Sequence, residues 1–172
     1  MKKWFTDILG SPIMVRRTPF RLGRMLEMVV DPDKGTLIAL VTTGRQVIAP
    51  VDLGPYSYGR FLVRDPDILL EMDELIRLKT IPSGKRRLFG KKVVTKSGKK
   101  LGRVYDLAFE METLSLIQIL VCKRFLYIWD LEKRIIGFKQ IHEITEEEII
   151  VKDSCAKQSS RRTTRVKKTS PA

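Results

Sequence analysis

The chain has 172 residues, of which 43% are hydrophobic, and a formal net charge of +13. A chain of this length can bury a core, and two cysteines are too few for the disulfide framework of a small secreted protein. The first residues lack the apolar region of a signal peptide, and no apolar run approaches the roughly 20 residues that span a bilayer. We therefore expect a cytoplasmic protein without a transmembrane helix.

The positive charge is concentrated in two segments. Residues 77–103 contain eleven Lys or Arg and no acid, and residues 153–172 contain six basic residues and one acid. Together the two segments carry +16, which leaves −3 for the rest of the chain. This regional excess predicts a partner with clustered negative charge.

The first nine residues include four apolar side chains that share one face of a helical turn, namely Trp4, Phe5, Ile8 and Leu9. They form either an interfacial membrane anchor or a lead-in that packs against the first domain. A single turn buries too little apolar area to hold a membrane alone. The lead-in is therefore the favoured alternative.

Strands are predicted at 12–16, from Leu22 to Val30, and at 36–41, 47–51 and 60–64. In the long strand, alternation places five residues on one face, which are Leu22, Arg24, Leu26, Met28 and Val30. Asp65-Pro66 is a helix start, and five apolar residues follow it at helical spacing, which are Ile68, Leu69, Met72, Leu75 and Ile76. A first domain at 8–78 and a linker at 79–87 follow from this order.

A second domain is expected at 88–153. Its strands are predicted at 91–95, from Leu101 to Glu110, and at 116–121, 134–140 and 148–151. Alternation places Arg103, Tyr105, Leu107 and Phe109 on one face of the long strand. Beyond it, residues 154–172 contain Val166 as the only aliphatic residue larger than alanine, so this basic tail is expected to be disordered and dispensable for folding.

The two predicted domains share an internal repeat. Residues 101–121 repeat residues 22–41, with Leu-Gly-Arg at the start, acids inside each strand (Glu27 and Asp106) and acids at its end (Asp31 and Glu110). Acids at equivalent positions are more simply explained by structural hydrogen bonds to turn amides than by a catalytic pair. The repeat predicts a strand, turn, strand unit used twice.

With the repeat aligned, the chain resembles a tandem PRC-barrel protein. The first copy matches at 9–13, 22–24, 31–41 and 48–52, and the second at 89–93, 97–104 and 141–153. The turn Met111-Glu112-Thr113-Leu114 departs from the family pattern because it lacks a glycine.

This resemblance implies an all-β fold of two small, strongly bent PRC-type β-barrels in tandem, with a short helix after the first and a disordered basic C-terminal tail. Related domains occur in the cytoplasmic subunit of photosynthetic reaction centres, in a ribosome maturation factor and in archaeal cell-division proteins. These roles share no reaction, so the fold implies an interaction module and no particular chemistry.

The sequence offers no catalytic or metal site. His142 is the only histidine, neither cysteine lies in a CxxC pair, and no GxxxxGK[ST] phosphate loop is present. We therefore expect a non-catalytic protein without a metal, a cofactor or a small-molecule substrate.

The basic residues carry the functional prediction. Those of the linker, the following hairpin and the tail are predicted to bind a polyanion: Lys85, Arg86, Arg87, Lys91, Lys92, Lys96, Lys99, Lys100, Arg103, Arg161, Arg162, Arg165, Lys167 and Lys168. RNA or a ribonucleoprotein is the first candidate partner, since the binding of phosphates to such a surface releases counterions and is favoured by that release. Two alternatives remain. One is a scaffold at an anionic membrane surface or in a division or envelope assembly, and the other is a plain protein-binding module whose charge is only a solvated face.

Two further expectations concern this surface. Phe125, Tyr127 and Trp129 lie beside Lys123 and Arg124 and either stack bases or, as we favour, pack within the protein. Replacing Arg86, Arg87, Lys91 and Lys92 is expected to weaken polyanion binding while changing stability little.

Overall fold

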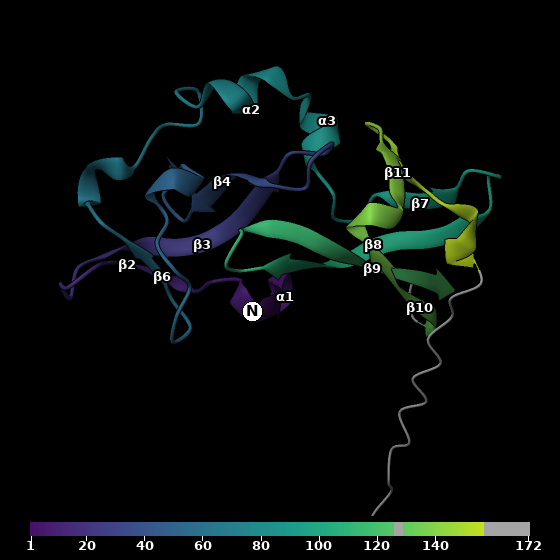
Figure 1. Ribbon diagram of the computed structural model, residues 1–172, viewed down its shortest axis with the longest axis horizontal. Helices are drawn as coiled ribbons and strands as arrows, with labels where there is room; N and C mark the ends of the chain where they lie inside the picture. Colours follow the sequence, from purple (N-terminus) through teal and green to yellow (C-terminus); the bar gives the residue numbers. More distant parts are fainter. Residues whose placement is uncertain (126–128, 157–172) are drawn as a thin grey trace, which may run out of the picture.

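The computed structural model describes residues 1–125 and 129–156 and shows a mainly β fold of two sheets placed side by side (Figure 1). The strands of the first half are β2 (Pro12–Val15), β3 (Arg21–Val30), β4 (Leu37–Thr42), β5 (Val47–Ile48) and β6 (Phe61–Val63). Those of the second are β7 (Lys92–Thr95), β8 (Lys100–Glu110), β9 (Ser115–Phe125), β10 (Trp129–Gly137), β11 (Ile141–Ile144) and β12 (Glu148–Val151).

Short elements connect and flank the sheets. They are β1 (Lys2–Trp4), α1 (Phe5–Ile8), α2 (Ile76–Thr80) and α3 (Ser83–Arg86), with 3-10 turns η1 (Pro50–Asp52), η2 (Pro66–Ile68), η3 (Phe138–Gln140) and η4 (Asp153–Ala156). None of the described helices is long and apolar enough to cross a membrane.

Strand pairing follows the same plan in both halves. β2 pairs antiparallel with β3 and parallel with β6, and β7 pairs antiparallel with β8 and parallel with β12. The orders are β5-β4-β3-β2-β6 and β10-β9-β8-β7-β12-β11, so neither sheet closes into a ring within the described residues. The sequence predicted closed barrels, whereas the described residues form open, bent sheets.

The predicted face assignments of the two long strands are wrong beyond a bulge. The pairing register shifts between Met25 and Glu27 in β3 and between Val104 and Asp106 in β8. A β-bulge inserts one extra residue and so exchanges the faces of the residues that follow. Met25 and Val104, which precede the bulges, consequently share the core with later residues that alternation had placed on the opposite face from them, such as Leu107.

The two halves join through the tips of their long hairpins. The Leu37 amide donates to the Leu114 carbonyl at 2.9 Å, and the Leu116 amide donates to the Gly35 carbonyl at 2.7 Å. These reciprocal bonds flank a bridge between Thr36 and Ser115. Because one apolar cluster also includes residues from both sheets, the halves pack as a single unit.

Leu114 explains how the second hairpin turns without a glycine. Its φ is +50°, close to the +70° of Gly35 at the equivalent position in the first hairpin. A left-handed backbone is costly for a branched side chain and persists only where its surroundings hold it. The hydrogen bond from the Leu37 amide to the Leu114 carbonyl provides that support, together with the adjacent bond from the Leu116 amide to the Gly35 carbonyl.

The N-terminal segment was predicted to pack against the first domain, but its strand pairs with the second half of the chain, and its buried side chains join the core that both halves share. β1 pairs antiparallel with the end of β8, and Phe5 and Ile8 of α1 are buried. The side chain of Asp106 fixes this position, because it accepts hydrogen bonds from the Thr6 amide at 3.3 Å and hydroxyl at 2.6 Å. The bulge at Asp106 thus also serves as an attachment point for residues 1–6.

The helix predicted after Asp65 is limited to one 3-10 turn. Asp65 caps η2 by accepting from the Asp67 amide at 2.9 Å, so the start signal is correct. The chain then leaves helical geometry because Leu70 pairs with Val47 through backbone bonds of 2.8 and 3.0 Å. α2 follows only at Ile76 and covers the outer face of the first sheet.

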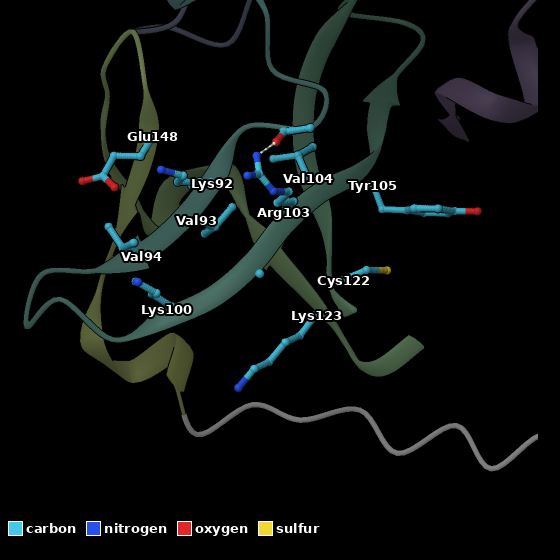
Figure 2. Close-up of a pocket in the computed structure, with 12 residues that line it drawn as sticks. Lys92, Val93, Val94, Lys100, Arg103, Val104, Tyr105, Cys122, Lys123 and Glu148 are labelled. Carbon is cyan, nitrogen blue, oxygen red and sulfur yellow. Dashed lines mark hydrogen bonds between the residues drawn. The ribbon is translucent and has the colours of Figure 1, made fainter. Parts of the chain in front are cut away.

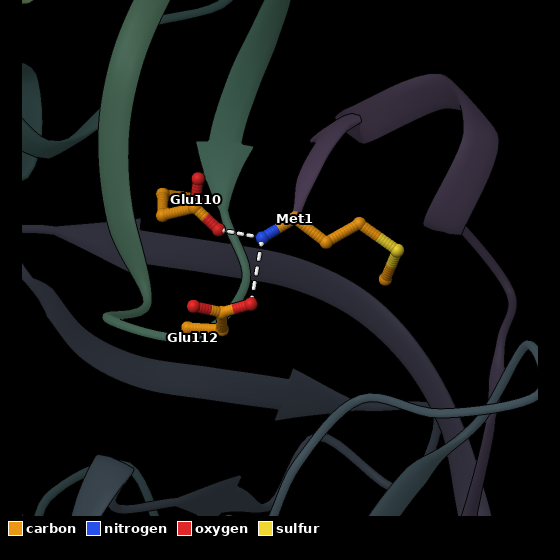
Figure 3. A network of polar contacts seen from close by, with 3 residues as sticks. All are labelled: Met1, Glu110 and Glu112. Carbon is orange, nitrogen blue, oxygen red and sulfur yellow. Dashed lines mark hydrogen bonds and ion pairs between the residues drawn. The ribbon is translucent and has the colours of Figure 1, made fainter.

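The amino group of Met1 lies between two carboxylates at the end of the β8–β9 hairpin (Figure 3). It donates to Glu110, and to Glu112 at 3.1 Å. The hydrogen bond to Glu110 raises the pKa of the amino group above 8.0, and the bond from the amino group lowers the pKa of Glu110 below 4.5.

The pKa shifts of this pair predict pH-dependent stability. The hydrogen bond that lowers the pKa of Glu110 stabilises the fold at pH values above 4.5, and this contribution is lost as the pH falls through the pKa of Glu110 in the folded protein. The interaction that raises the pKa of the Met1 amino group stabilises the fold at pH values below 8.0, and this contribution is lost as the pH rises through the pKa of the amino group in the folded protein. The free energy of unfolding of Glu110→Gln, measured in urea, should therefore vary less with pH than that of the wild type, at both acidic and alkaline pH. Glu143→Gln, at an exposed position of β11, is the control, and equal profiles for the two variants would refute the role of the pair.

The described structure continues three residues beyond the predicted boundary at Asp153. Asp153 to Ala156 form η4, and Cys155 is fully buried in the main core. Arg134, itself buried, holds this turn by donating to the carbonyls of Cys155 at 3.1 Å and Ala156 at 2.8 Å. No local pattern indicates this turn, because the polar residues around Cys155 surround a single buried side chain. The rest of the tail, 157–172, lies outside the described residues.

Truncation after Asp153 should consequently destabilise the fold, whereas truncation after Ala156 should not. The shorter chain loses a buried thiol and leaves the guanidinium of Arg134 without two acceptors, a loss of about 2–4 kcal/mol. Thermal unfolding of both truncated chains beside the full chain measures the difference. Equal melting temperatures for all three would show that η4 contributes nothing.

Candidate functional site

A surface groove of about 580 Å³ lies over the start of the second sheet, where β7, β8 and β9 run side by side (Figure 2). Four basic side chains line it, namely Lys92, Lys100, Arg103 and Lys123, and Glu148 is the one acid among the lining residues. We call this set the basic groove. Its volume is within the range of protein sites that hold a small ligand or one unit of a polymer.

Strand register brings the basic side chains together. Lys92 faces Arg103 across the β7–β8 pair, and Arg103 faces Cys122 across the β8–β9 pair, which places Lys123 next to it. Residues about 30 positions apart in sequence thus become neighbours. In the described residues, neither Lys92 nor Lys100 uses its ammonium group in an ion pair or hydrogen bond, so both remain available to a ligand.

Arg103 has a structural role as well. Its guanidinium donates to the Gly90 carbonyl at 2.7 Å, and in the first half Arg24 donates to Gly10 at 2.9 Å in the same arrangement. Gly10 and Gly90 both adopt φ near +75°. The Leu-Gly-Arg motif therefore fixes the chain that enters each sheet, and one Arg103 guanidinium nitrogen, Nη1, is used in this bond.

Tyr105 forms one edge of the basic groove and is 44% exposed. The ammonium of Lys133 lies 5.7 Å from the centre of its ring, a cation–π contact. Lys133 and Tyr105 come from β10 and β8, which lie on the two sides of β9. The contact extends the positive charge beyond the basic groove toward β10.

Lys91 does not belong to the predicted polyanion surface. It is only 7% exposed, and its ammonium donates to the Gly84 carbonyl at 2.5 Å and to the Thr145 carbonyl at 2.7 Å. Burial lowers the pKa of Lys91, and the nearby charge of Glu146 offsets part of that effect. Lys91 therefore joins α3 to the β11–β12 loop, and its prediction as a ligand-binding residue is wrong.

The other predicted basic residues occupy several places. Lys85 and Arg86 lie half-buried on α3, and Arg87 follows them, exposed, at its end. Lys96 and Lys99 are exposed in the β7–β8 turn, which Asp153 holds by accepting from the Ser97 amide at 3.0 Å and hydroxyl at 2.8 Å.

Six predicted features lie outside the described residues. Five are the basic residues of the tail, which are Arg161, Arg162, Arg165, Lys167 and Lys168. The sixth is the aromatic set, because Tyr127 and the side chains of Phe125 and Trp129 are not described. The choice between base stacking and internal packing for these aromatics stays open.

The repeated acids have separate roles. The carboxylate of Asp31 accepts from the amides of Asp33 at 2.9 Å and Lys34 at 3.1 Å, which confirms the predicted bond to turn amides. Asp106 instead holds the N-terminal segment, and Glu27 at the equivalent position is exposed. Among the described residues, no group of three or more His, Cys, Asp or Glu is placed to hold a metal ion.

Residues 83–153 match the PRC-barrel domain family. The match runs from α3 to the first residue of η4 and includes the whole basic groove. No curated protein matches the chain. The second half of this mainly β chain therefore matches one PRC-barrel domain.

Proposed function

We propose that the chain is a non-catalytic adaptor of two PRC-type barrels, whose second barrel binds RNA or a ribonucleoprotein through the basic groove. The observation that carries the proposal is the convergence of four basic side chains on three adjacent strands, with one acid among them. A phosphate backbone binds such a site by releasing counterions.

Correspondence between the halves supports the tandem arrangement. Strand pairing, the bulges in the long strands and the arginine-to-glycine bonds recur at equivalent positions. The first half has Pro12 and Leu26 where the basic groove has Lys92 and Tyr105. The same scaffold thus carries the basic groove in its second half only, as expected for an adaptor with two different faces.

The charge around the basic groove supports a long polyanion over a small ligand. Exposed Lys96 and Lys99 extend it at one end, and the Lys133–Tyr105 contact extends it toward β10. η4, from which the basic tail continues, is tied to the same β7–β8 turn through Asp153. A single strand of RNA suits a positive surface that extends beyond the basic groove at both ends, because it can follow the groove and bring its unpaired bases to Tyr105.

Replacing Lys92, Lys100 and Lys123 with serine should weaken RNA binding strongly. Each lost phosphate contact flattens the slope of log K against log salt by about 0.7 for a single strand, so three contacts give about 2. Fluorescence anisotropy of a labelled single-stranded RNA over a salt series measures both affinity and slope. Exposed substitutions of this kind should leave the melting temperature nearly unchanged.

A matched control removes the same charge elsewhere. Lys34, Arg60 and Arg64 are exposed in the first half, and their replacement with serine also removes three positive charges. If this control weakens RNA binding as much as the groove variant does, only net charge matters and the basic groove is not the site. If neither variant changes binding, the basic groove is a solvated face and the protein-binding alternative replaces the proposal.

A further inference from the structure

The β2–β3 hairpin carries a second basic surface, distinct from the basic groove. Between Ser11 and Leu26 the chain has four arginines and no acid, namely Arg16, Arg17, Arg21 and Arg24. Its tip, 16–21, is exposed at every residue, and the turn protrudes at the first-half end of the molecule (Figure 1). This end lies away from the strands of the basic groove.

Phe20 stands out at the tip because it is 56% exposed. Backbone and side-chain bonds fix its place: the Val15 amide donates to the Phe20 carbonyl at 2.9 Å, and the Phe20 amide donates to the Thr18 hydroxyl at 3.2 Å. Arg17 completes the turn with a φ of +64°. Phe20 is therefore exposed on a turn whose backbone is fixed by hydrogen bonds, between arginines that precede and follow it.

Apolar exposure continues along the same hairpin. Leu26 of β3 is exposed, and so is Leu9, whose neighbour Gly10 donates from its amide to the Met25 carbonyl at 2.9 Å. Bases stack on aromatic rings but gain little from isolated aliphatic side chains. The headgroup region of a bilayer accepts both kinds of side chain and attracts arginine when its lipids are anionic.

We infer that the β2–β3 hairpin docks on an anionic phospholipid surface, with Phe20 inserted at the interface and Arg16, Arg17 and Arg21 on the lipid phosphates. An apolar insertion combined with several cations gives the two signals that stable peripheral binding needs. The equivalent turn of the second half has Lys99 where the first has Phe20, so it offers charge without the insertion. The inference does not depend on the proposed RNA site, since it rests on different residues.

Flotation with vesicles tests this inference in the full-length protein. Vesicles of mixed phosphatidylglycerol and phosphatidylcholine should bind the wild type, and vesicles of phosphatidylcholine alone should not. Phe20→Ser should reduce partitioning by about tenfold, and the double variant Arg16→Ser/Arg17→Asn by about tenfold or more. Asparagine at position 17 tolerates the left-handed backbone found there.

Two comparisons make the result specific. Lys96→Ser/Lys99→Ser removes two charges from the opposite turn and should retain near wild-type partitioning. Phe20→Ser should leave RNA binding, measured by anisotropy, unchanged. Loss of vesicle binding at the hairpin can therefore be distinguished from loss of RNA binding at the basic groove. Absence of binding to anionic vesicles overturns the membrane inference and leaves the RNA proposal standing. A loss of RNA binding rather than vesicle binding in Phe20→Ser would make the hairpin a nucleic-acid contact instead.

Discussion

Gly102→Ala should unfold the protein or destabilise it by about 4 kcal/mol or more, the largest effect expected of any single substitution here. A Cβ at this position would lie 2.3 Å from the Cys122 carbonyl oxygen and 2.6 Å from its carbon, and the φ of Gly102 is +137°. The backbone of β9 cannot retreat, because it is held in the ladder with β8 on one side and β10 on the other.

Gly23→Ala is the matched control for Gly102→Ala. Gly23 occupies the equivalent position in β3, where the nearest atom to a new Cβ is the Thr43 hydroxyl at 3.1 Å. A side chain can rotate away, so a loss of about 1–2 kcal/mol is expected. Urea unfolding of both variants measures the difference. Equal losses would show that close strand contact at Cys122 is not what requires a glycine.

Lys91→Met should cost about 2–4 kcal/mol, although it only removes a charge from a basic segment. The ammonium of Lys91 is the hydrogen-bond donor to the carbonyls of Gly84 and Thr145, and methionine would leave both without this partner. Lys92→Met, at the adjacent exposed position, should change stability by less than about 0.5 kcal/mol. Thermal or urea unfolding distinguishes the two.

The same substitution should also loosen α3. Hydrogen exchange at 83–87 should accelerate in Lys91→Met and remain unchanged in Lys92→Met, since Lys91, unlike Lys92, donates hydrogen bonds that join this helix to the β11–β12 loop. Similar stability and exchange in both variants would mean that the two bonds contribute little. The sequence predicted little change in stability when Arg86, Arg87, Lys91 and Lys92 are replaced together. The structure instead predicts that this variant loses stability, because it lacks Lys91.

Local pattern was enough to predict most strands but not their faces. The hairpin turn at Gly35 and the strand at 148–151 follow directly from residue type and alternation. The faces of β3 and β8 could not be predicted, because each bulge depends on the pairing with the neighbouring strand, which alternation within one strand does not show. Leu114 at a left-handed position is similar, since its support comes from the other half of the chain.

The candidate site was predicted only in part for the same reason. The run of basic residues identifies Lys92, Lys100 and Arg103 as candidates, but it does not distinguish them from Lys91. The side chain of Lys91 is buried, although the residues on either side of it are exposed. Lys123 enters the basic groove through the β8–β9 register, which no local pattern contains. The attachment of residues 1–6 to β8 is also a long-range pairing.

Hydrogen–deuterium exchange of the full-length protein, with and without a single-stranded RNA at low salt, tests the central claim most directly. Protection should be greatest in β7, in the first residues of β8 and in β9 around Lys123, and it should disappear as salt is raised. The groove variant should lose this protection while keeping its unbound exchange pattern. Protection confined to the first half, or no protection at a concentration that shifts anisotropy, would contradict the assignment of RNA binding to the basic groove.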